Sequence, residues 1–211
     1  MQSIPVHRSI LAVDIEKSTS PQRTNPVKEE LRRQVYRLLD EALGLAGIDG
    51  RYLDPMEDRG DGVLALIHPA DEVPKTLLLG TFVPELTRLL VEYNDGLGPL
   101  ERKGGLGLRL RVAIHAGEVH FDRQGFFGEE VDVACRLLDA RRFKKVLSES
   151  PGPLALIVSE DIYWSIVRHD YAGIRGAAFH QVVSMQVSGR RRQGYVHIPG
   201  EAEEGDTEFA A

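Results

Sequence analysis

The chain has 211 residues, of which 42% are hydrophobic and 27% are charged, and its formal net charge at pH 7 is -6. This is ordinary globular composition, so the sequence favours a folded chain over a disordered one. The acidic balance disfavours a dedicated nucleic-acid-binding protein, which usually presents a basic face to phosphates. We therefore expect no nucleic-acid partner.

The cysteine content and the apolar runs bear on where the protein works. Cys135 is the single cysteine, which excludes an internal disulfide and fits a reducing compartment. Residues 1–6 lack the basic and apolar regions of a secretion signal. The longest apolar runs, such as residues 76–83, are too short to cross a bilayer as a helix. We expect a cytoplasmic protein without a membrane partner.

The first third of the chain predicts a strand, a helix and a hairpin. Residues 9–14 read SILAVD, an apolar run that suits a buried strand and ends in a carboxylate. After a polar loop over residues 16–26, apolar residues recur at helical spacing until Gly47, which is suited to end the helix. Residues 52–68 predict a hairpin with a Gly-Asp-Gly turn at residues 60–62.

The middle of the chain predicts a second helix and a second strand. Residues 77–93 have helical periodicity, although Pro84 is expected to kink the axis. A glycine-rich loop over residues 94–107 follows. Residues 108–119 then alternate as a half-buried strand, with apolar side chains on one side and arginines on the other.

The last third predicts a turn, a helix, a strand, a capped helix and a terminal hairpin. The turn is expected at Gly125 and Gly128, the helix over residues 129–146 and the strand over residues 154–158. The capped helix follows the N-cap Ser159 and runs through residue 169, and residues 179–187 and 195–198 form the hairpin. No repeat or long linker interrupts this order. We predict one α/β (α+β) domain over residues 1–199, and an acidic, disordered tail over residues 200–211.

Two carboxylates lie where a strand meets a loop. Asp14 ends the first predicted strand, and Asp61 occupies the hairpin turn. If these strands are neighbours, the carboxylates converge and suit Mg²⁺, which binds one or two carboxylates together with substrate phosphates. Two ions about 3.5 to 4 Å apart can activate an attacking oxygen and neutralise a triphosphate. Taken singly, the simpler interpretation is that each aspartate only serves its turn or strand end.

Four motifs, in order, resemble the class III adenylate and guanylate cyclases. They are Asp14-Ile15, Gly60-Asp61, the VAIHAG run at residues 112–117 and the GEEVDVACRL run at residues 128–137. The resemblance covers residues 9–140, with weaker agreement to residue 198. It implies a ferredoxin-like domain with a central, mostly antiparallel sheet flanked by helices. It also implies a homodimer that converts a nucleoside triphosphate to a 3′,5′-cyclic nucleotide and pyrophosphate.

The resemblance assigns metal and transition-state roles to specific residues. Asp14, the backbone carbonyl of Ile15 and Asp61 would hold two Mg²⁺ or Mn²⁺ ions, and Arg136 would stabilise the transition state. Asp132 stands where the family has a ribose-orienting asparagine. An aspartate can accept a hydrogen bond from a ribose hydroxyl but cannot donate one, and it repels phosphate. A surface arginine paired with a carboxylate is the simpler interpretation of Arg136.

Phosphate contacts are expected in the loop that follows Asp14. Its backbone N–H groups, with the side chains of Lys17, Ser18 and Thr19, would receive the β- and γ-phosphates. The family also uses a lysine near the end of the sheet, which this chain lacks. The candidates to replace it are Arg59, Arg190, Arg191 and Arg192, although a solvated basic turn explains the last three equally well.

The sequence does not single out one nucleobase for the substrate. By register with the family, Glu57 and Gly125 take the two base-reading positions. Glu57 favours guanine, Gly125 supplies no side chain, and neither purine pair is complete, so GTP or a pyrimidine nucleotide is favoured over ATP. Compact cyclases similar to this one make cyclic UMP or cyclic CMP in bacterial anti-phage signalling.

Two other hypotheses compete with an active cyclase. A catalytically degenerate cyclase-fold module would bind nucleotide and signal without turnover, as the Asp132 substitution suggests. A polymerase-like or purely structural role is weaker, because nothing indicates template binding. His115 and His120 are expected to be structural and not metal ligands, since no cysteines accompany them.

Overall fold

The computed structural model describes residues 4–200. Its strands form one sheet in the order β2-β3-β1-β4-β6-β8-β7, and β5 pairs with β4 beyond that path. Every pairing is antiparallel except that of β4 with β6. The strands are β1 (Val6–Ile15), β2 (Glu57–Asp58), β3 (Gly62–Ile67), β4 (Leu110–Asp122), β5 (Gly125–Phe127), β6 (Leu154–Ser159), β7 (His180–Val187) and β8 (Arg190–His197).

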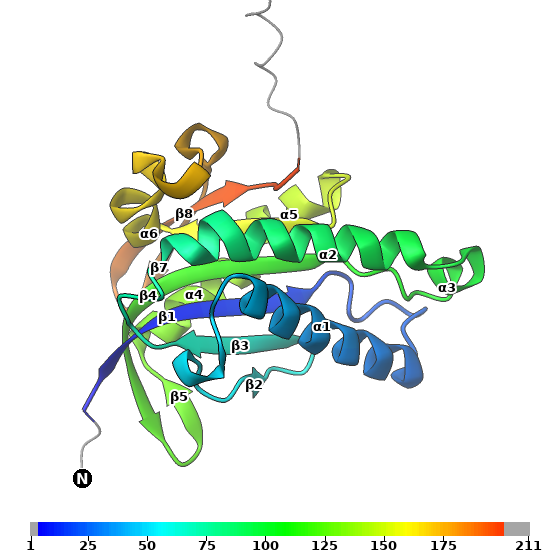
Figure 1. Ribbon diagram of the computed structural model, residues 1–211, viewed down its shortest axis with the longest axis horizontal. Coiled ribbons are helices and arrows are strands. Elements are labelled where there is room, and N and C mark those ends of the chain that lie inside the picture. The colour runs from blue at the N-terminus through cyan, green and yellow to red at the C-terminus, as the bar shows by residue number, and fades with distance from the viewer. Residues whose placement is uncertain (1–3, 201–211) are drawn as a thin grey trace, which may run out of the picture.

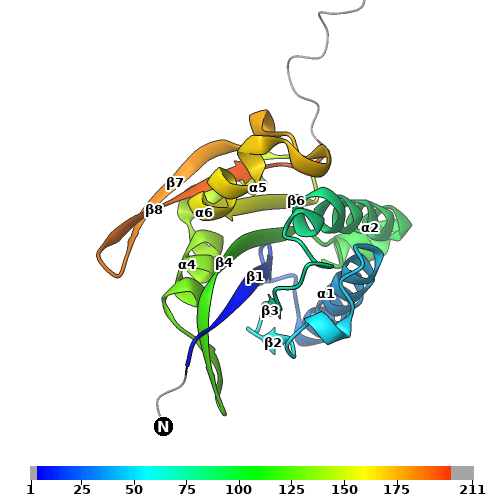
Figure 2. The same cartoon turned by 60° about the vertical axis from the view of Figure 1, so that its left-hand side comes forward.

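Helices cover both faces of this sheet (Figures 1 and 2). The α1 and α2 helices pack on one face, and α4 and α5 pack on the other. The helices are α1 (Asn25–Leu45), the π-helix η2 (Leu78–Phe82), α2 (Val83–Gly96), α3 (Pro99–Lys103), α4 (Glu129–Asp139), α5 (Arg141–Glu149) and α6 (Glu160–Ser165). Short 3-10 turns are η1 (Gly50–Tyr52), η3 (Val167–His169), η4 (Tyr171–Gly173) and η5 (Gly176–Ala178).

The position of β1 in the sheet explains why its sequence is a continuous apolar run. Leu11 and Val13 enter the core on the α1 side, whereas Ile10 and Ala12 enter the core on the α4 side. Both faces of β1 are therefore buried, as a central strand requires. The predicted first strand, first helix and hairpin are confirmed, and the predicted mostly antiparallel sheet flanked by helices is confirmed.

Four predicted segments differ from the structure. The helix predicted after Ser159 through 169 ends at Ser165, because Ile166 leaves the helical conformation, and the 3-10 turn η3 follows. The helix predicted over residues 77–93 is a π-helical turn followed by α2, with Pro84 in the first turn of α2. Proline donates no backbone hydrogen bond and crowds the preceding carbonyls, and a π-helical turn accommodates that defect. The helix predicted over residues 129–146 breaks at Ala140, whose ψ of 125° is not helical. The loop predicted over residues 94–107 contains the short helix α3.

The C-terminal hairpin forms as predicted, with a longer second strand. β8 begins at Arg190, so the three arginines lie in the strand, and the turn is formed by Ser188 and Gly189, both at positive φ. The tail predicted over residues 200–211 lies, after residue 200, outside the described residues. Within residues 4–200, no helix is long and apolar enough to cross a membrane.

Candidate functional site

The two predicted metal-binding carboxylates come together at one end of the sheet. Asp14 pairs with Gly62 across β1 and β3, and the backbone N–H of Ile15 donates to the carbonyl of Asp61 at 3.0 Å. A Cβ at Gly62 would lie 2.2 Å from the carbonyl oxygen of Val13. Glycine at that position is what lets the hairpin approach β1 and deliver Asp61 beside Asp14.

Asp14 is held by an arginine that the sequence interpretation placed on a solvated side of β4. Arg111 is the direct cross-strand partner of Asp14, is 8% exposed, and is buried rather than solvated. Its Nε and Nη2 atoms donate to the two carboxylate oxygens at 2.6 and 2.8 Å. Burial raises the pKa of Asp14, an effect that Arg111 opposes and the nearby charge of Asp61 reinforces.

The donor set fits a hard divalent cation. Each ionised carboxylate has about four lone-pair positions, so the pairing with Arg111 leaves Asp14 able to accept further contacts. Two neighbouring carboxylates with one arginine favour an added positive charge. Across residues 4–200, no group of three or more histidine, cysteine or acidic side chains forms a metal cage. Mg²⁺ typically binds one or two carboxylates and completes its shell with water and phosphate oxygens, so Asp14 and Asp61 would suffice to hold it.

The loop after Asp14 is fixed by contacts on both sides. The Ser18 hydroxyl donates to the Asp61 carboxylate. The Glu16 N–H donates to the carbonyl of Arg109 at 2.9 Å, and Arg23 donates to the Glu16 carbonyl at 2.7 Å. Lys17 has φ of 55°, in the left-handed region. The loop is therefore held in one shape beside the carboxylates.

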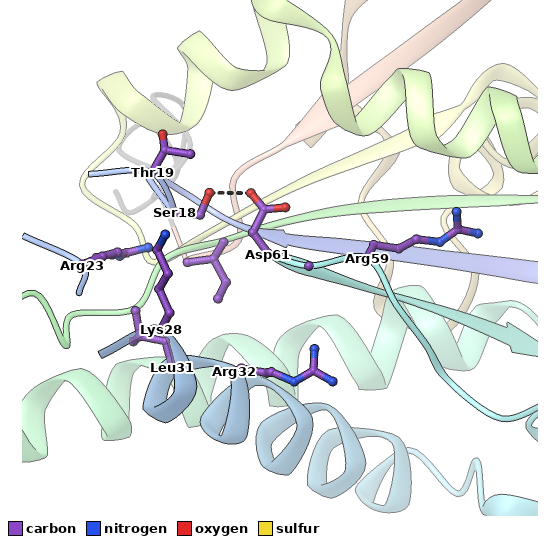
Figure 3. A pocket seen from close by; sticks show the side chains of 10 residues that line it. Ser18, Thr19, Arg23, Lys28, Leu31, Arg32, Arg59 and Asp61 are labelled. Atoms are coloured by element: carbon purple, nitrogen blue, oxygen red, sulfur yellow. Dashed lines mark hydrogen bonds between the residues drawn. The ribbon is translucent and has the colours of Figure 1, made fainter. Parts of the chain in front are cut away.

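A cavity of about 340 Å³ opens on the α1 side of Asp61 (Figure 3). Its lining includes hydroxyl groups and several cations: Ser18, Thr19, Arg23, Lys28, Arg32 and Arg59. Its apolar lining is Ile15 and Leu31. Among the described residues that line it, neither Asp132 nor Arg136 is present.

The two predicted base-reading residues, Glu57 and Gly125, lie against each other. The Glu57 carboxylate accepts from the backbone N–H of Phe126 at 2.8 Å and from Arg59 at 2.8 Å. Gly125 has φ of 129°, and a Cβ there would lie 2.3 Å from Glu57 Oε1. Gly125 therefore leaves room for the Glu57 carboxylate, a role that the sequence alone did not indicate.

This contact predicts the effect of Gly125→Ala. The substitution imposes a left-handed φ on alanine and displaces Glu57 from the Phe126 N–H, so we expect a loss of about 1 to 3 kcal/mol in the free energy of unfolding. Urea denaturation measures it. The matched control is Gly44→Ala in α1, where a Cβ meets nothing within 4 Å and helix propensity predicts no loss. Equal stability of Gly125→Ala and wild type would contradict the packing described.

The fourth helix presents the two residues assigned to ribose and transition state. Asp132 and Arg136 are both exposed and lie four residues apart on α4. Within residues 4–200, the Arg136 side chain has no hydrogen bond or ion pair, unlike the paired surface arginine of the simpler interpretation. Cys135, one residue before Arg136, lies close enough to Arg59 and Glu57 for their charges to act on its pKa, which burial raises. Through Cys135, α4 therefore lies near Glu57 and Arg59.

The arginines of the last hairpin are mostly engaged in other contacts. Arg192 lies 3.1 Å from Glu129 and 3.3 Å from Glu130, and Arg191 donates to the Ser184 hydroxyl at 2.9 Å. Arg192 is therefore paired with the carboxylates in the first turn of α4 and is not free to bind a phosphate.

His115 has the structural environment that we expected. It is 0% exposed, with Nδ1 2.7 Å from the Ser159 hydroxyl and Nε2 2.6 Å from the Glu130 carboxylate. The Ser159 oxygen also accepts from the N–H of Ile162 as a helix N-cap at 3.4 Å. These contacts fit a neutral imidazole with its proton on Nε2. His120 stacks on Phe127 with ring centroids 5.3 Å apart.

The buried imidazole predicts a pH dependence of stability. Burial lowers the pKa of His115 from 6.5, against the charges of Glu130 and Asp161, while Arg192 lowers it further. The unfolded chain therefore takes up the proton first, so stability is present above 6.5 and falls as the pH drops toward the folded-state pKa. The slope is at most about 1.4 kcal/mol per pH unit.

His115→Gln is the variant that isolates this effect, because glutamine retains hydrogen-bonding capacity without titrating. Urea unfolding at several pH values between about 7.5 and 5.5 should give a shallower loss of stability for His115→Gln than for wild type. Parallel curves would show that His115 does not carry the effect.

Comparison with known proteins bears on the fold. No protein-family model matches the chain, and no curated protein matches it. Among solved structures, an adenylate/guanylate cyclase/hydrolase from Silicibacter pomeroyi matches with 20% identity and a TM-score of 0.63, over 94% of this chain and 100% of that one. The chain has the fold of a class III nucleotidyl cyclase catalytic domain.

Two further structures agree with that fold. The guanylyl cyclase Cya2 has 18% identity and a TM-score of 0.60, over 98% of each chain. The adenylyl cyclase CyaB from P. aeruginosa has 15% identity and a TM-score of 0.59, over 97% of this chain and 100% of that one. The cyclase-like fold that the sequence motifs implied is therefore confirmed.

Proposed function

We propose that this protein is a nucleotidyl cyclase that converts a nucleoside triphosphate to its 3′,5′-cyclic monophosphate and pyrophosphate. The observation that carries the proposal is the convergence of Asp14 and Asp61 at one end of β1 and β3. Within a cyclase fold, that convergence supplies the ligands for Mg²⁺ or Mn²⁺, two ions per site.

Each residue has a defined task in this proposal. Asp14, Asp61 and the carbonyl of Ile15 would hold the ions, which would supply Lewis-acid activation of the attacking oxygen and of the triphosphate. Arg111 orients the Asp14 carboxylate by its two hydrogen bonds. Lys17, Ser18 and Thr19 lie in the loop that receives the phosphates.

Arg136 stabilises the negative charge that develops as the 3′-oxygen attacks the α-phosphate. A guanidinium is suited to this task because it stays charged and donates several hydrogen bonds in a plane. Asp132, four residues earlier on the same helix, contacts the ribose by accepting a hydrogen bond from a hydroxyl group.

We propose that the site is completed by a second copy of the chain. Asp61 lines the cavity on the α1 side, whereas Arg136 is exposed on α4 and does not line that cavity. A symmetric homodimer can bring the α4 surface of one copy to the carboxylates of the other, which produces two sites.

The proposed base is guanine or a pyrimidine in preference to adenine. Glu57, close to Gly125, offers a carboxylate that accepts from N–H donors, and Arg59 beside it offers donors to base carbonyls. We also propose a role in anti-phage signalling in the cytoplasm, which a pyrimidine product would fit.

Two observations favour a second candidate, a degenerate nucleotide-binding module. The Asp14 carboxylate is already paired with Arg111 through both oxygens, and Asp132 replaces the asparagine of active cyclases. Such a module would bind nucleotide and metal but release no cyclic product.

The test is to incubate purified protein separately with ATP, GTP, CTP and UTP plus Mn²⁺ or Mg²⁺, and to identify products by mass spectrometry. A 3′,5′-cyclic nucleotide is the expected product, and the most productive substrate identifies the base. Metal-dependent nucleotide binding with no cyclic product from any of the four would favour the degenerate module instead.

A further inference from the structure

We infer that Lys28 is the cation that contacts the terminal phosphates of the nucleoside triphosphate, which the cavity on the α1 side of Asp61 would receive. The inference rests on the proposed function, because it concerns part of the same substrate. The cyclases that this chain resembles bind the triphosphate with a lysine near the end of the sheet, which this chain lacks. The inference assigns that role to Lys28 of α1, on the opposite face of the sheet from α4.

The cations that line the cavity differ in whether a carboxylate pairs with them. Arg32 forms an ion pair with Asp58, and Arg59 forms one with Glu57 at 2.8 Å. These two arginines are therefore neutralised by carboxylates. Within residues 4–200, Lys28 has no ion pair or side-chain hydrogen bond.

Arg23 adds a second positive charge, and no carboxylate of the described residues forms an ion pair with it. It donates to the backbone carbonyls of Glu16 at 2.7 Å and Gly107 at 3.0 Å. Carbonyl oxygens satisfy its donors but do not cancel its charge. Figure 3 shows the ends of Lys28 and Arg23 directed toward the space that the Ser18–Asp61 hydrogen bond borders.

The chemistry of the lining points to a polyanion that extends away from the carboxylates. Lys28, Arg23 and the Ser18 and Thr19 hydroxyls are donors, and Asp61 is the only carboxylate among the described residues that line the cavity. Divalent ions held at Asp61 would turn the net charge further positive. A linear polyphosphate anchored at Asp61 would then place its terminal phosphates near Lys28, and a lysine ammonium is a common point-charge partner of phosphate.

The experiment measures binding of inorganic tripolyphosphate, the probe that has the phosphate chain without nucleoside, in the presence of excess Mn²⁺. Calorimetric titration of Lys28→Ala should give a dissociation constant roughly tenfold above that of wild type. Lys28→Arg keeps the charge and should stay within about threefold of wild type. The matched control is Lys103→Ala, because Lys103 is an exposed lysine of α3 outside the cavity lining.

The outcomes separate this inference from the proposed function. Unchanged tripolyphosphate affinity in Lys28→Ala, an equal loss in Lys103→Ala, or no binding by wild type would each overturn the inference. Circular dichroism establishes that the variants are folded. Lys28-dependent binding in a protein that makes no cyclic nucleotide would leave the inference standing and defeat only the proposed enzymatic activity.

Discussion

Asp61→Asn should remove the proposed cyclase activity while leaving the fold intact. Asparagine retains the shape and can still accept the hydrogen bond from Ser18, but it lacks the charge that holds a divalent ion. We expect kcat to fall at least about 1,000-fold, which corresponds to several kcal/mol of lost transition-state stabilisation. Cyclic-nucleotide formation under saturating triphosphate and Mn²⁺ measures it.

Ser18→Ala is the matched control for Asp61→Asn. It removes the hydrogen bond to Asp61 and leaves the carboxylate in place, so the loss should be far smaller, about tenfold or less. Near-wild-type activity in Asp61→Asn would show that the carboxylate does not take part, and the proposed assignment of the metal site would then fail.

The second large effect is complementation between inactive chains. We expect Asp14→Ala/Asp61→Ala and Arg136→Ala each to be inactive as homodimers. A heterodimer of the two, purified through different tags, has one site with intact carboxylates from one copy and an intact Arg136 from the other. Because only one of its two sites is complete, its activity should be about half that of wild type.

A non-complementing pair controls for tag and purification effects. Asp14→Ala with Asp61→Ala places both defects in the same half of the site, so both sites of that heterodimer are damaged and it should stay inactive. Equal activity in the two heterodimers, or none in the complementing one, would contradict a site shared between copies.

The sequence predicts much of the fold because its apolar patterns are strong. The buried run of β1 and the helical spacing in α1 leave few alternatives, and the glycine turn before β3 marks the hairpin. Convergence of Asp14 and Asp61 follows once β1 and β3 are neighbours. These elements depend on local pattern and on one antiparallel pairing.

The contacts that sequence reasoning missed depend on register between distant strands. Arg111 alternates like a solvated residue, and only its pairing with Asp14 across β1 and β4 shows that it is buried. The hydrogen bond from the backbone N–H of Phe126 to the Glu57 carboxylate likewise requires β5 to fold back toward β2. The break at Ala140 was missed because charged residues on both sides continue a helical pattern, and no glycine or proline marks it.

The most direct test of the central claim is the product balance of the wild-type protein with its best triphosphate and Mn²⁺. Mass spectrometry and a pyrophosphate assay would measure both products in one time course. A cyclase should release one pyrophosphate per 3′,5′-cyclic nucleotide, with no linear monophosphate and no inorganic phosphate. Linear monophosphate or diphosphate as the main product, or no turnover despite nucleotide binding, would contradict the account.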